Sequence, residues 1–234
     1  MVLISRAAEG GGTWALLAAA GTGARLGIDR PKAFAELRGR PLLAESLDRL
    51  DRCPWIDAIV VAAPAGWEEP VILLAEELAV TKVVSCVTGG ATRSESVRTA
   101  LGDVPEEALV VLVHDAARPL LEDEVVERVL APLAEGFDGV VPTLPVSDTV
   151  KRVERGVVVE TIDRDGLVGA QTPQAFLPPA LKRAFAGDIF GATDCASLVE
   201  RVGGRVAVVD GDARLLKVTT AADLDLIGAL VAAS

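Results

Sequence analysis

Two cationic residues accompany a glycine-rich loop near the N-terminus of the chain. An apolar segment over 14–20 runs directly into the sequence GTGARLG, where Arg25 comes two residues after the second glycine, and Lys32 follows seven residues later. Glycine lets a backbone fold closely around an anion, and an arginine and a lysine beside such a loop neutralise phosphate charge. Each cation alone also fits solvated surface charge. Beside the loop, the pair predicts a triphosphate site.

The loop matches neither of two common nucleotide-binding patterns. In G-x-G-x-x-G the third glycine is replaced here by Leu26, and G-x-x-x-x-G-K-[ST] does not occur. A dinucleotide site also needs an acid at the end of the second strand, where this chain has Ala62, Ala63 and Pro64. The spacing therefore disfavours both an NAD enzyme and a Walker A protein.

A second segment that can do chemistry, HDAARP, follows the apolar run 109–113. Parallel strands bring their carboxyl ends to one edge of a sheet, so Asp115 should lie near the glycine loop, where a carboxylate can bind Mg²⁺. Asp115 equally fits a helix N-cap or a turn. We expect His114 to be a packed, hydrogen-bonded ring. Arg118 either pairs with the acidic run 122–124 or binds an acceptor phosphate.

A third segment, GGATRSES, ends one apolar run and begins a helix. Its small residues and free N–H groups suit the edge of a flat ring, which favours Gly90 and Ser96 as ligand contacts. Ser94 fits an N-cap better. Further polar residues are ordinary one by one, and Thr193 or Asp194 also fits an N-cap; this set comprises Arg164, Thr172, Thr193, Asp194 and Lys217.

Composition removes several classes of function. The 234 residues carry 23 Lys and Arg against 34 Asp and Glu, a net charge of −11, which opposes nucleic-acid binding. The single histidine and three scattered cysteines support neither a histidine-rich metal site, nor a disulfide framework, nor a structural zinc site. We expect the cysteines to be core thiols. Because no apolar run reaches about 18 residues and no signal peptide is recognisable, we expect a cytoplasmic protein.

Short apolar runs alternate with helical patterns, without a linker or a repeat. The alternation predicts a flexible tail over 1–13 and one α/β domain over 14–234, a Rossmann-like three-layer sandwich with a mainly parallel sheet. Helical spacing of apolar residues predicts helices around 43–50 and 125–133, and a last helix that opens at Thr220 with Asp223 three residues on. The expected strands are 14–20, 58–63, 82–87, 109–113, 139–143, 205–209 and 215–218.

One segment breaks the alternation. Two β-rich runs, 148–153 and 157–162, surround the sequence ERG and predict a β-hairpin within a protruding arm at about 145–163. An isolated two-stranded ribbon is marginal in water. We therefore expect the arm to pack on another subunit of a homodimer.

Seven blocks of the sequence together resemble the 2-C-methyl-D-erythritol 4-phosphate cytidylyltransferases of the non-mevalonate isoprenoid pathway. They run from about residue 14 to the C-terminus in the order of that family: AAGTGARLGIDRPKAF, GGATRSESV, VLVHDAARP, PVSDTVKR, IDRDGL with QTPQAF, TDCASLVE and LLKVTTAADL. Ribitol-5-phosphate cytidylyltransferases share most of these blocks. The alternatives are therefore another polyol-phosphate cytidylyltransferase and, from a different class, a nucleotide-binding regulator without turnover.

The resemblance implies transfer of CMP from CTP to the polyol phosphate, with release of pyrophosphate. It implies that Arg25 and Lys32 clamp the triphosphate and the transition state, that Lys217 holds the α-phosphate, and that Asp115 holds the Mg²⁺ that bridges the phosphates of CTP. The CTP site would comprise Ala19, Ala20, Gly21, Gly23, Gly90 and Ser96. The acceptor site would comprise Asp115, Arg118, Thr149, Arg164, Thr172 and Thr193, with Thr149 and Arg164 near the ends of a dimer arm.

The chain departs from the family pattern at three positions. Ala18 replaces a frequent proline, and Ala24 stands where a second cation is often found. Cys195 occupies the place of an acid after Thr-Asp, which bears on how Thr193 is oriented. The implied reaction needs no general base, because a phosphate monoester is already an anion at neutral pH.

Overall fold

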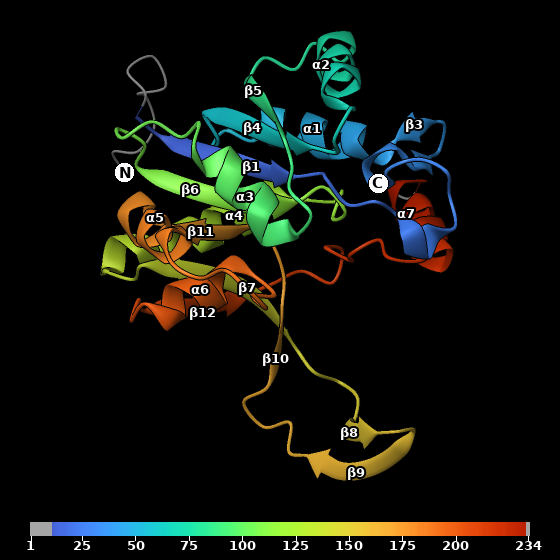
Figure 1. Ribbon diagram of the computed structural model, residues 1–234, viewed down its shortest axis with the longest axis vertical. Coiled ribbons are helices and arrows are strands. Elements are labelled where there is room, and N and C mark those ends of the chain that lie inside the picture. The colour runs from blue at the N-terminus through green and yellow to red at the C-terminus, as the bar shows by residue number, and fades with distance from the viewer. Residues whose placement is uncertain (1–10, 233–234) are drawn as a thin grey trace.

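The apolar segments form a sheet of eight strands in the order β10-β7-β11-β6-β1-β4-β5, with β12 paired to β7 (Figure 1). The structure is a computed structural model that describes residues 11–232. Most neighbouring strands run in parallel, whereas β10 and β11 are antiparallel to their partners. The strands are β1 (Thr13–Ala18), β4 (Ala58–Ala63), β5 (Val83–Thr88), β6 (Val110–Asp115), β7 (Gly139–Pro145), β10 (Val168–Ala170), β11 (Gln174–Phe176) and β12 (Val206–Asp210).

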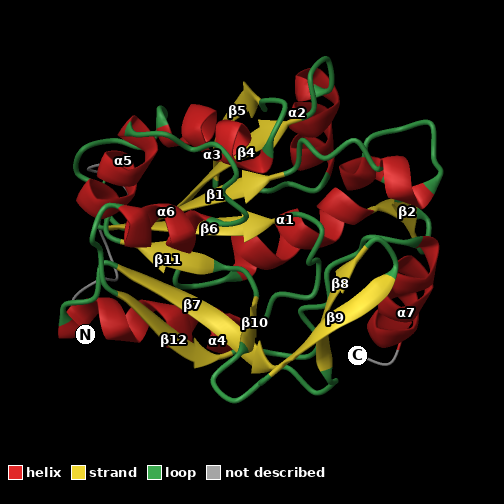
Figure 2. Cartoon of the chain, turned by 60° about the horizontal axis from the view of Figure 1, so that its bottom comes forward, coloured by secondary structure: helices red, strands yellow, loops and turns green. Residues whose placement is uncertain are grey.

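Helices cover both faces of this sheet, and Figure 2 shows its strands in order from β5 to β12 between them. Alternate strand residues serve opposite faces. Leu17 packs in one core cluster with α1 (Leu42–Arg52), α2 (Glu68–Glu77) and α4 (Asp123–Leu130). Leu16 packs in the other with α3 (Arg93–Leu101), α5 (Pro178–Ala186) and α6 (Cys195–Arg201). The predicted three-layer sandwich with a mainly parallel sheet is confirmed.

Short elements and one helix complete the body. They are the 3-10 turns η2 (Ala24–Leu26), η3 (Lys32–Phe34) and η4 (Ala131–Glu135), the strands β2 (Glu36–Leu37) and β3 (Arg40–Pro41), and α7 (Ala221–Ala232). Ile227 of α7 packs against Leu42 and Val218 in a third core cluster. Asp223 accepts a hydrogen bond from the backbone N–H of Thr220, and its own N–H donates to Thr220 Oγ1. The predicted start of the last helix is confirmed.

The hairpin consists of β8 (Val150–Glu154) and β9 (Val157–Ile162), a separate two-stranded sheet that stands away from the body (Figure 1). Arg155 and Gly156 connect the strands with φ angles of 48° and 81°, the left-handed pair that a two-residue hairpin loop requires. The predicted hairpin is confirmed. Four of its valines, at 153, 157, 158 and 159, are 51% to 65% exposed, so the arm presents apolar surface to water.

Several predicted boundaries are wrong. The segment 215–218 is not a strand; it is a loop whose side chains at Leu215 and Val218 are buried. The first strand begins at Thr13 and ends at Ala18, whereas the prediction placed it at 14–20. Residues 1–10 of the expected tail lie outside the described residues. Within 11–232, no helix is long and apolar enough to cross a membrane.

Candidate active site

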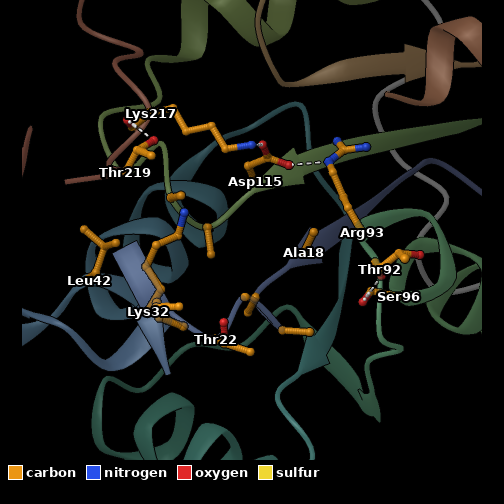
Figure 3. Close-up of a pocket in the computed structure, with 18 of the residues that line it drawn as sticks. Ala18, Thr22, Lys32, Leu42, Thr92, Arg93, Ser96, Asp115, Lys217 and Thr219 are labelled. Carbon is orange, nitrogen blue, oxygen red and sulfur yellow. Dashed lines mark hydrogen bonds and ion pairs between the residues drawn. The ribbon is translucent and has the colours of Figure 1, made fainter. Parts of the chain in front are cut away.

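A pocket of about 320 Å³ lies where β1, β5 and β6 reach their carboxyl ends (Figure 3). In parallel sheets ligands bind at this edge. Its walls come from the glycine loop after β1, the loop between β5 and α3, the end of β6 and the segment before α7. The predicted site residues that line it are Ala19, Ala20, Gly21, Gly23, Arg25, Lys32, Gly90, Ser96, Asp115 and Lys217.

The glycine loop folds back onto Lys32. The backbone N–H of Lys32 donates to Gly21 O at 3.0 Å, and Gly23 has a φ of 77°. A Cβ atom at Gly23 would lie 3.1 Å from the Lys32 backbone nitrogen, so this approach needs glycine. The Lys32 ammonium donates to Val218 O at 3.0 Å. The loop thus brings Arg25 and Lys32 to one pocket, although they lie seven residues apart in the sequence.

The loop after β5 packs directly on the loop after β1. A Cβ atom at Gly89 would lie 2.4 Å from the Ala20 Cβ, so only glycine fits there. Ser96 accepts a hydrogen bond from Gly90 N–H and donates to Thr92 O at 2.9 Å. Ser96 therefore fixes the shape of this wall. The N-cap of α3 is Thr92, in a capping box with Glu95, so the expectation of a cap at Ser94 is wrong.

Asp115 is 5% exposed and lies between two cations (Figure 3). Its Oδ1 accepts from Arg93 Nε at 2.7 Å, and its Oδ2 accepts from Lys217 Nζ at 2.6 Å. Burial alone would raise the pKa of the carboxyl, but Arg93 and Lys217 outweigh burial and hold it well below its usual range. Asp115 is therefore a charged group at the end of β6, not a helix cap.

His114 and Thr172 form a buried network behind Asp115. Thr172 Oγ1 accepts from Asp115 N–H at 3.1 Å and lies 3.2 Å from His114 Nδ1, while His114 Nε2 lies 3.0 Å from Arg118 O. These contacts fit a neutral ring with its proton on Nε2. Burial lowers the pKa of His114 to about 4, so the ring is neutral at neutral pH. The expectation of a packed, hydrogen-bonded histidine is confirmed.

Arg118 lies outside the pocket lining and does not pair with the acidic run 122–124. Its Nη1 donates to Leu215 O, and its buried Nε has no hydrogen-bond partner among residues 11–232. Glu122 instead pairs with Arg49 at 2.9 Å and with Arg214 at 3.1 Å. The ion-pair alternative for Arg118 is therefore wrong.

The structure does not bring Thr149, Arg164 and Thr193 into the pocket lining. Thr149 and Arg164 are exposed at the base of the arm, where Arg164 donates to the backbone oxygens of Val146 and Ser147. Thr193 is exposed just before α6. Asp194 caps that helix by accepting from Ser197 N–H at 3.0 Å, as one of the two alternatives predicted. A single chain therefore brings the residues predicted to bind CTP into one pocket. The residues predicted only for the acceptor do not line it, namely Arg118, Thr149, Arg164, Thr172 and Thr193.

Residues that the sequence did not single out also line the pocket. Arg93 is the most important, because it is the first residue of α3 and forms an ion pair with Asp115. Leu42, Thr92 and Thr219 are among the others. A cation next to an N-cap at a strand end, within GGATRSES, is the signal that could have identified Arg93. The three cysteines are free, with Cys53 and Cys195 buried, as expected for core thiols.

The donor set suits a metal that arrives with a phosphorylated substrate. No group of three or more His, Cys, Asp or Glu side chains that could hold a metal occurs in the described part of the chain, and Asp115 is the carboxylate that lines the pocket. Mg²⁺ is commonly held by one or two carboxylates together with substrate phosphates and water. Asp115 is charged, and its partners Arg93 and Lys217 are groups that also bind phosphate. The residues therefore fit Mg²⁺ bound jointly with a nucleotide.

Lys32 gives the site a pH dependence. Burial, then repulsion by Lys217, lowers the pKa of Lys32 to about 8. Below that pH the ligand-free Lys32 carries its charge, and above it the charge is lost. A bound triphosphate favours the ammonium form, so binding of a nucleoside triphosphate above about pH 8 should take up protons. Calorimetry in two buffers of different ionisation enthalpy measures this uptake. Lys32→Arg should abolish it, and equal uptake by that variant would exclude Lys32 as the source.

Glycine-rich loops, a cluster of cations and a single carboxylate meet at this sheet edge, and these are features of a nucleotide-binding protein of the α/β class. A model of the family "2-C-methyl-D-erythritol 4-phosphate cytidylyltransferase" matches residues 13–233. The chain belongs to this family and is a nucleotidyltransferase enzyme. It is 46% identical over 224 residues to the enzyme of that name from Saccharopolyspora erythraea, covering 93% of this chain and 98% of the relative. It is 44% identical to that of Nocardia farcinica, covering 94% of each.

Solved structures of the family share the fold. The 4-diphosphocytidyl-2C-methyl-D-erythritol synthase of Anaerococcus prevotii superposes with a TM-score of 0.80 at 27% identity, over 96% of this chain and 100% of that one. The 2-C-methyl-D-erythritol 4-phosphate cytidylyltransferase of Thermus thermophilus gives 0.75 at 32% identity, over 93% and 98%. The predicted fold class and family are thereby confirmed.

Proposed function

We propose that the pocket at the ends of β1, β5 and β6 transfers CMP from CTP to 2-C-methyl-D-erythritol 4-phosphate, with release of pyrophosphate. This is the reaction that the family name describes, on the route to isoprenoids. The observation that carries the proposal is Asp115, a charged carboxylate held between Arg93 and Lys217 at the mouth of a glycine-loop pocket. That arrangement offers cations to phosphate and a hard oxygen to a metal.

The nucleotide base would lie between the two glycine loops. Ala20 packs so closely on Gly89 that no side chain fits at position 89, and the Ser96 hydroxyl accepts a hydrogen bond from Gly90 N–H. A slot lined by such small residues suits a pyrimidine better than a purine. Contacts to cytosine and ribose would come from Ala19, Ala20, Gly21, Gly23, Gly90 and Ser96.

The acceptor's phosphate oxygen would attack the α-phosphorus of CTP in line with the departing pyrophosphate. A general base is unnecessary, since the acceptor is already an anion, and His114 is buried, neutral and committed to Arg118 O and Thr172. Mg²⁺, when bound with CTP, supplies charge neutralisation on the phosphates. The chain's own contribution is positioning and positive charge from Arg25, Lys32 and Lys217.

Lys217 and Arg25 should act mainly in the transition state. The Lys217 side chain is 39% exposed, so a phosphate can reach it despite its ion pair with Asp115. Lys217→Ala and Arg25→Ala should each lower kcat by about 10² or more, with a smaller change in the KM for CTP. Steady-state kinetics with CTP varied measures both. Arg128→Ala, at an exposed position of α4, is the control for loss of one positive charge, and a pure KM effect in Lys217→Ala would contradict the assignment.

A panel of acceptors tests the proposed function itself. Pyrophosphate release would be followed with CTP against 2-C-methyl-D-erythritol 4-phosphate, ribitol 5-phosphate and erythritol 4-phosphate. We expect the methylated acceptor to have the highest kcat/KM by at least tenfold, and CTP to be preferred over ATP. Ribitol 5-phosphate as the best acceptor would favour the second candidate, and no turnover with any acceptor would favour a binding protein.

Quaternary structure and location also belong to this proposal. The exposed valines of the arm are more apolar surface than a free hairpin tolerates, which supports a homodimer in which each arm packs on the partner. Arg118, Thr172 and Thr193 of one subunit would then meet Thr149 and Arg164 of the other at the acceptor. The free thiols of Cys53, Cys86 and Cys195 support a reducing compartment, the cytoplasm.

A further inference from the structure

The guanidinium of Arg93 is only partly used. Its Nε donates to Asp115 Oδ1 at 2.7 Å, and its Nη1 donates to Cys195 Sγ at 3.3 Å. Its Nη2 is buried and has no hydrogen-bond partner among residues 11–232; the other such atom is Arg118 Nε. A buried N–H without an acceptor is costly, so it indicates a group that the chain does not itself supply.

Positive charge around Asp115 exceeds negative charge. Four cations act on this region, namely Arg93, Arg118, Lys32 and Lys217, and one buried carboxylate faces them. The thiol of Cys195 adds no charge, because burial raises its pKa. A bound phosphate would offset this excess of positive charge. The two buried atoms without a hydrogen-bond partner, Arg93 Nη2 and Arg118 Nε, are guanidinium nitrogens, and guanidinium groups bind phosphate oxygens well.

The two sides of Asp115 differ in their surroundings. In Figure 3, Lys217 and Arg93 reach the carboxylate from opposite directions. Lys217 lies on the side of Lys32 and the glycine loop, where the triphosphate is proposed to bind. Arg93 contacts α6 through Cys195, and α6 follows directly after Thr193. Since the proposed function assigns Thr193 to the acceptor, a phosphate bound on the Arg93 side would be the acceptor's.

We propose that Arg93 is an additional substrate-binding residue, whose Nη2 donates to a phosphate oxygen of the acceptor while Asp115 and Cys195 fix the plane of the guanidinium. This inference rests on the proposed function. Two anchored nitrogens hold the third in one direction before substrate arrives, and this pre-organisation lowers the entropy cost of binding. A lysine cannot reproduce this arrangement, because its single ammonium nitrogen lacks the three coplanar nitrogens of a guanidinium.

The test compares Arg93→Lys with Arg98→Lys, a matched change at an exposed position of the same helix. Calorimetry gives the Kd of CTP with Mg²⁺ in the absence of acceptor. Kinetics at saturating CTP give the KM for the acceptor and the inhibition constant of inorganic phosphate competing with it. Arg93→Lys should raise the acceptor KM and the inhibition constant of phosphate by about tenfold or more, with the CTP Kd within about twofold of wild type. Arg98→Lys should change none of these three constants.

Two results would overturn the inference. A weaker CTP Kd with an unchanged acceptor KM would mean that Arg93 serves only Asp115 and the nucleotide, and no change in either would make its role structural. Because Arg93→Lys can disturb folding, Cys195→Ala provides a second variant. It loosens the guanidinium and should raise the acceptor KM while sparing CTP binding. Absence of turnover by the wild-type enzyme would instead refute the proposed function.

Discussion

Asp115→Asn should reduce turnover by at least about 10² while leaving the fold intact. The amide has nearly the same shape as the carboxylate, so the contact of Thr172 with Asp115 N–H can persist. The charge, however, is lost from between Arg93 and Lys217, and a hard anionic oxygen is lost to the metal. Initial rates of pyrophosphate release, with the unfolding temperature as a check on structure, measure the effect.

The exposed Asp225→Asn on α7 serves as the control and should behave like wild type. EDTA should abolish activity of the wild-type enzyme, and Mg²⁺ should restore it. Full activity in EDTA would contradict the proposed dependence of turnover on Mg²⁺. An active Asp115→Asn enzyme would show that this carboxylate only balances the two cations.

Replacement of residues 148–162 by a short Gly-Ser loop should give a monomer that binds CTP but no longer uses the acceptor. The exposed valines of the hairpin would be gone, and with them the apolar contact proposed to join two subunits. The CTP site should survive, because its walls come from the loops at Gly21 and Gly90. Sedimentation reports the oligomeric state, and calorimetry the CTP affinity.

A double variant, Thr149→Ala with Arg164→Ala, separates the two roles of the arm. It should remain dimeric, since neither side chain belongs to the apolar strands, but should lose acceptor turnover. A deletion variant that stays dimeric with normal acceptor kinetics would show that the hairpin is only a surface excursion.

Mixed dimers show which subunit supplies the arm. Arg164→Ala and Lys217→Ala would each be nearly inactive alone. If sites are shared, a dimer with one of each contains one fully intact site, and random mixing should restore about a quarter of wild-type activity. Absence of recovery in mixtures shown to exchange subunits would place the arm and the pocket of each site on the same chain.

Regular elements were predictable where local pattern and tertiary structure agree. The run at 58–63 is valine- and alanine-rich and buried on both faces, and its bounds match β4. The hairpin was predictable because two β-rich runs flank a short segment that contains a glycine, and Gly156 adopts one of the two positive φ angles of the turn. The segment 215–218 has a strand-like pattern but is a loop, because its backbone oxygens bind Arg118 and Lys32 in place of a neighbouring strand.

The missed features depend on contacts distant in sequence. The strands β10 and β11 have three residues each, and their pairing with β7 and β6 defines them more than their own composition. Arg93 lies 22 residues before Asp115 and 102 before Cys195, so no local spacing links the three. Thr149 and Arg164 lie outside the pocket of their own chain. Whether they reach the pocket of a second chain depends on how two chains pack together, which a single sequence does not describe.

Isotope transfer tests the central claim, that this pocket joins the acceptor's phosphate to the α-phosphorus of CTP. The acceptor would be labelled with ¹⁸O on all non-bridging phosphate oxygens and converted with CTP and Mg²⁺, and the products would be analysed by ³¹P NMR and mass spectrometry. In-line attack by the acceptor predicts a product in which a diphosphate links cytidine to the polyol. This product retains every labelled oxygen, one of them bridging the two phosphorus atoms, and the pyrophosphate is unlabelled. Labelled pyrophosphate, or release of CMP without a joined product, would contradict the account.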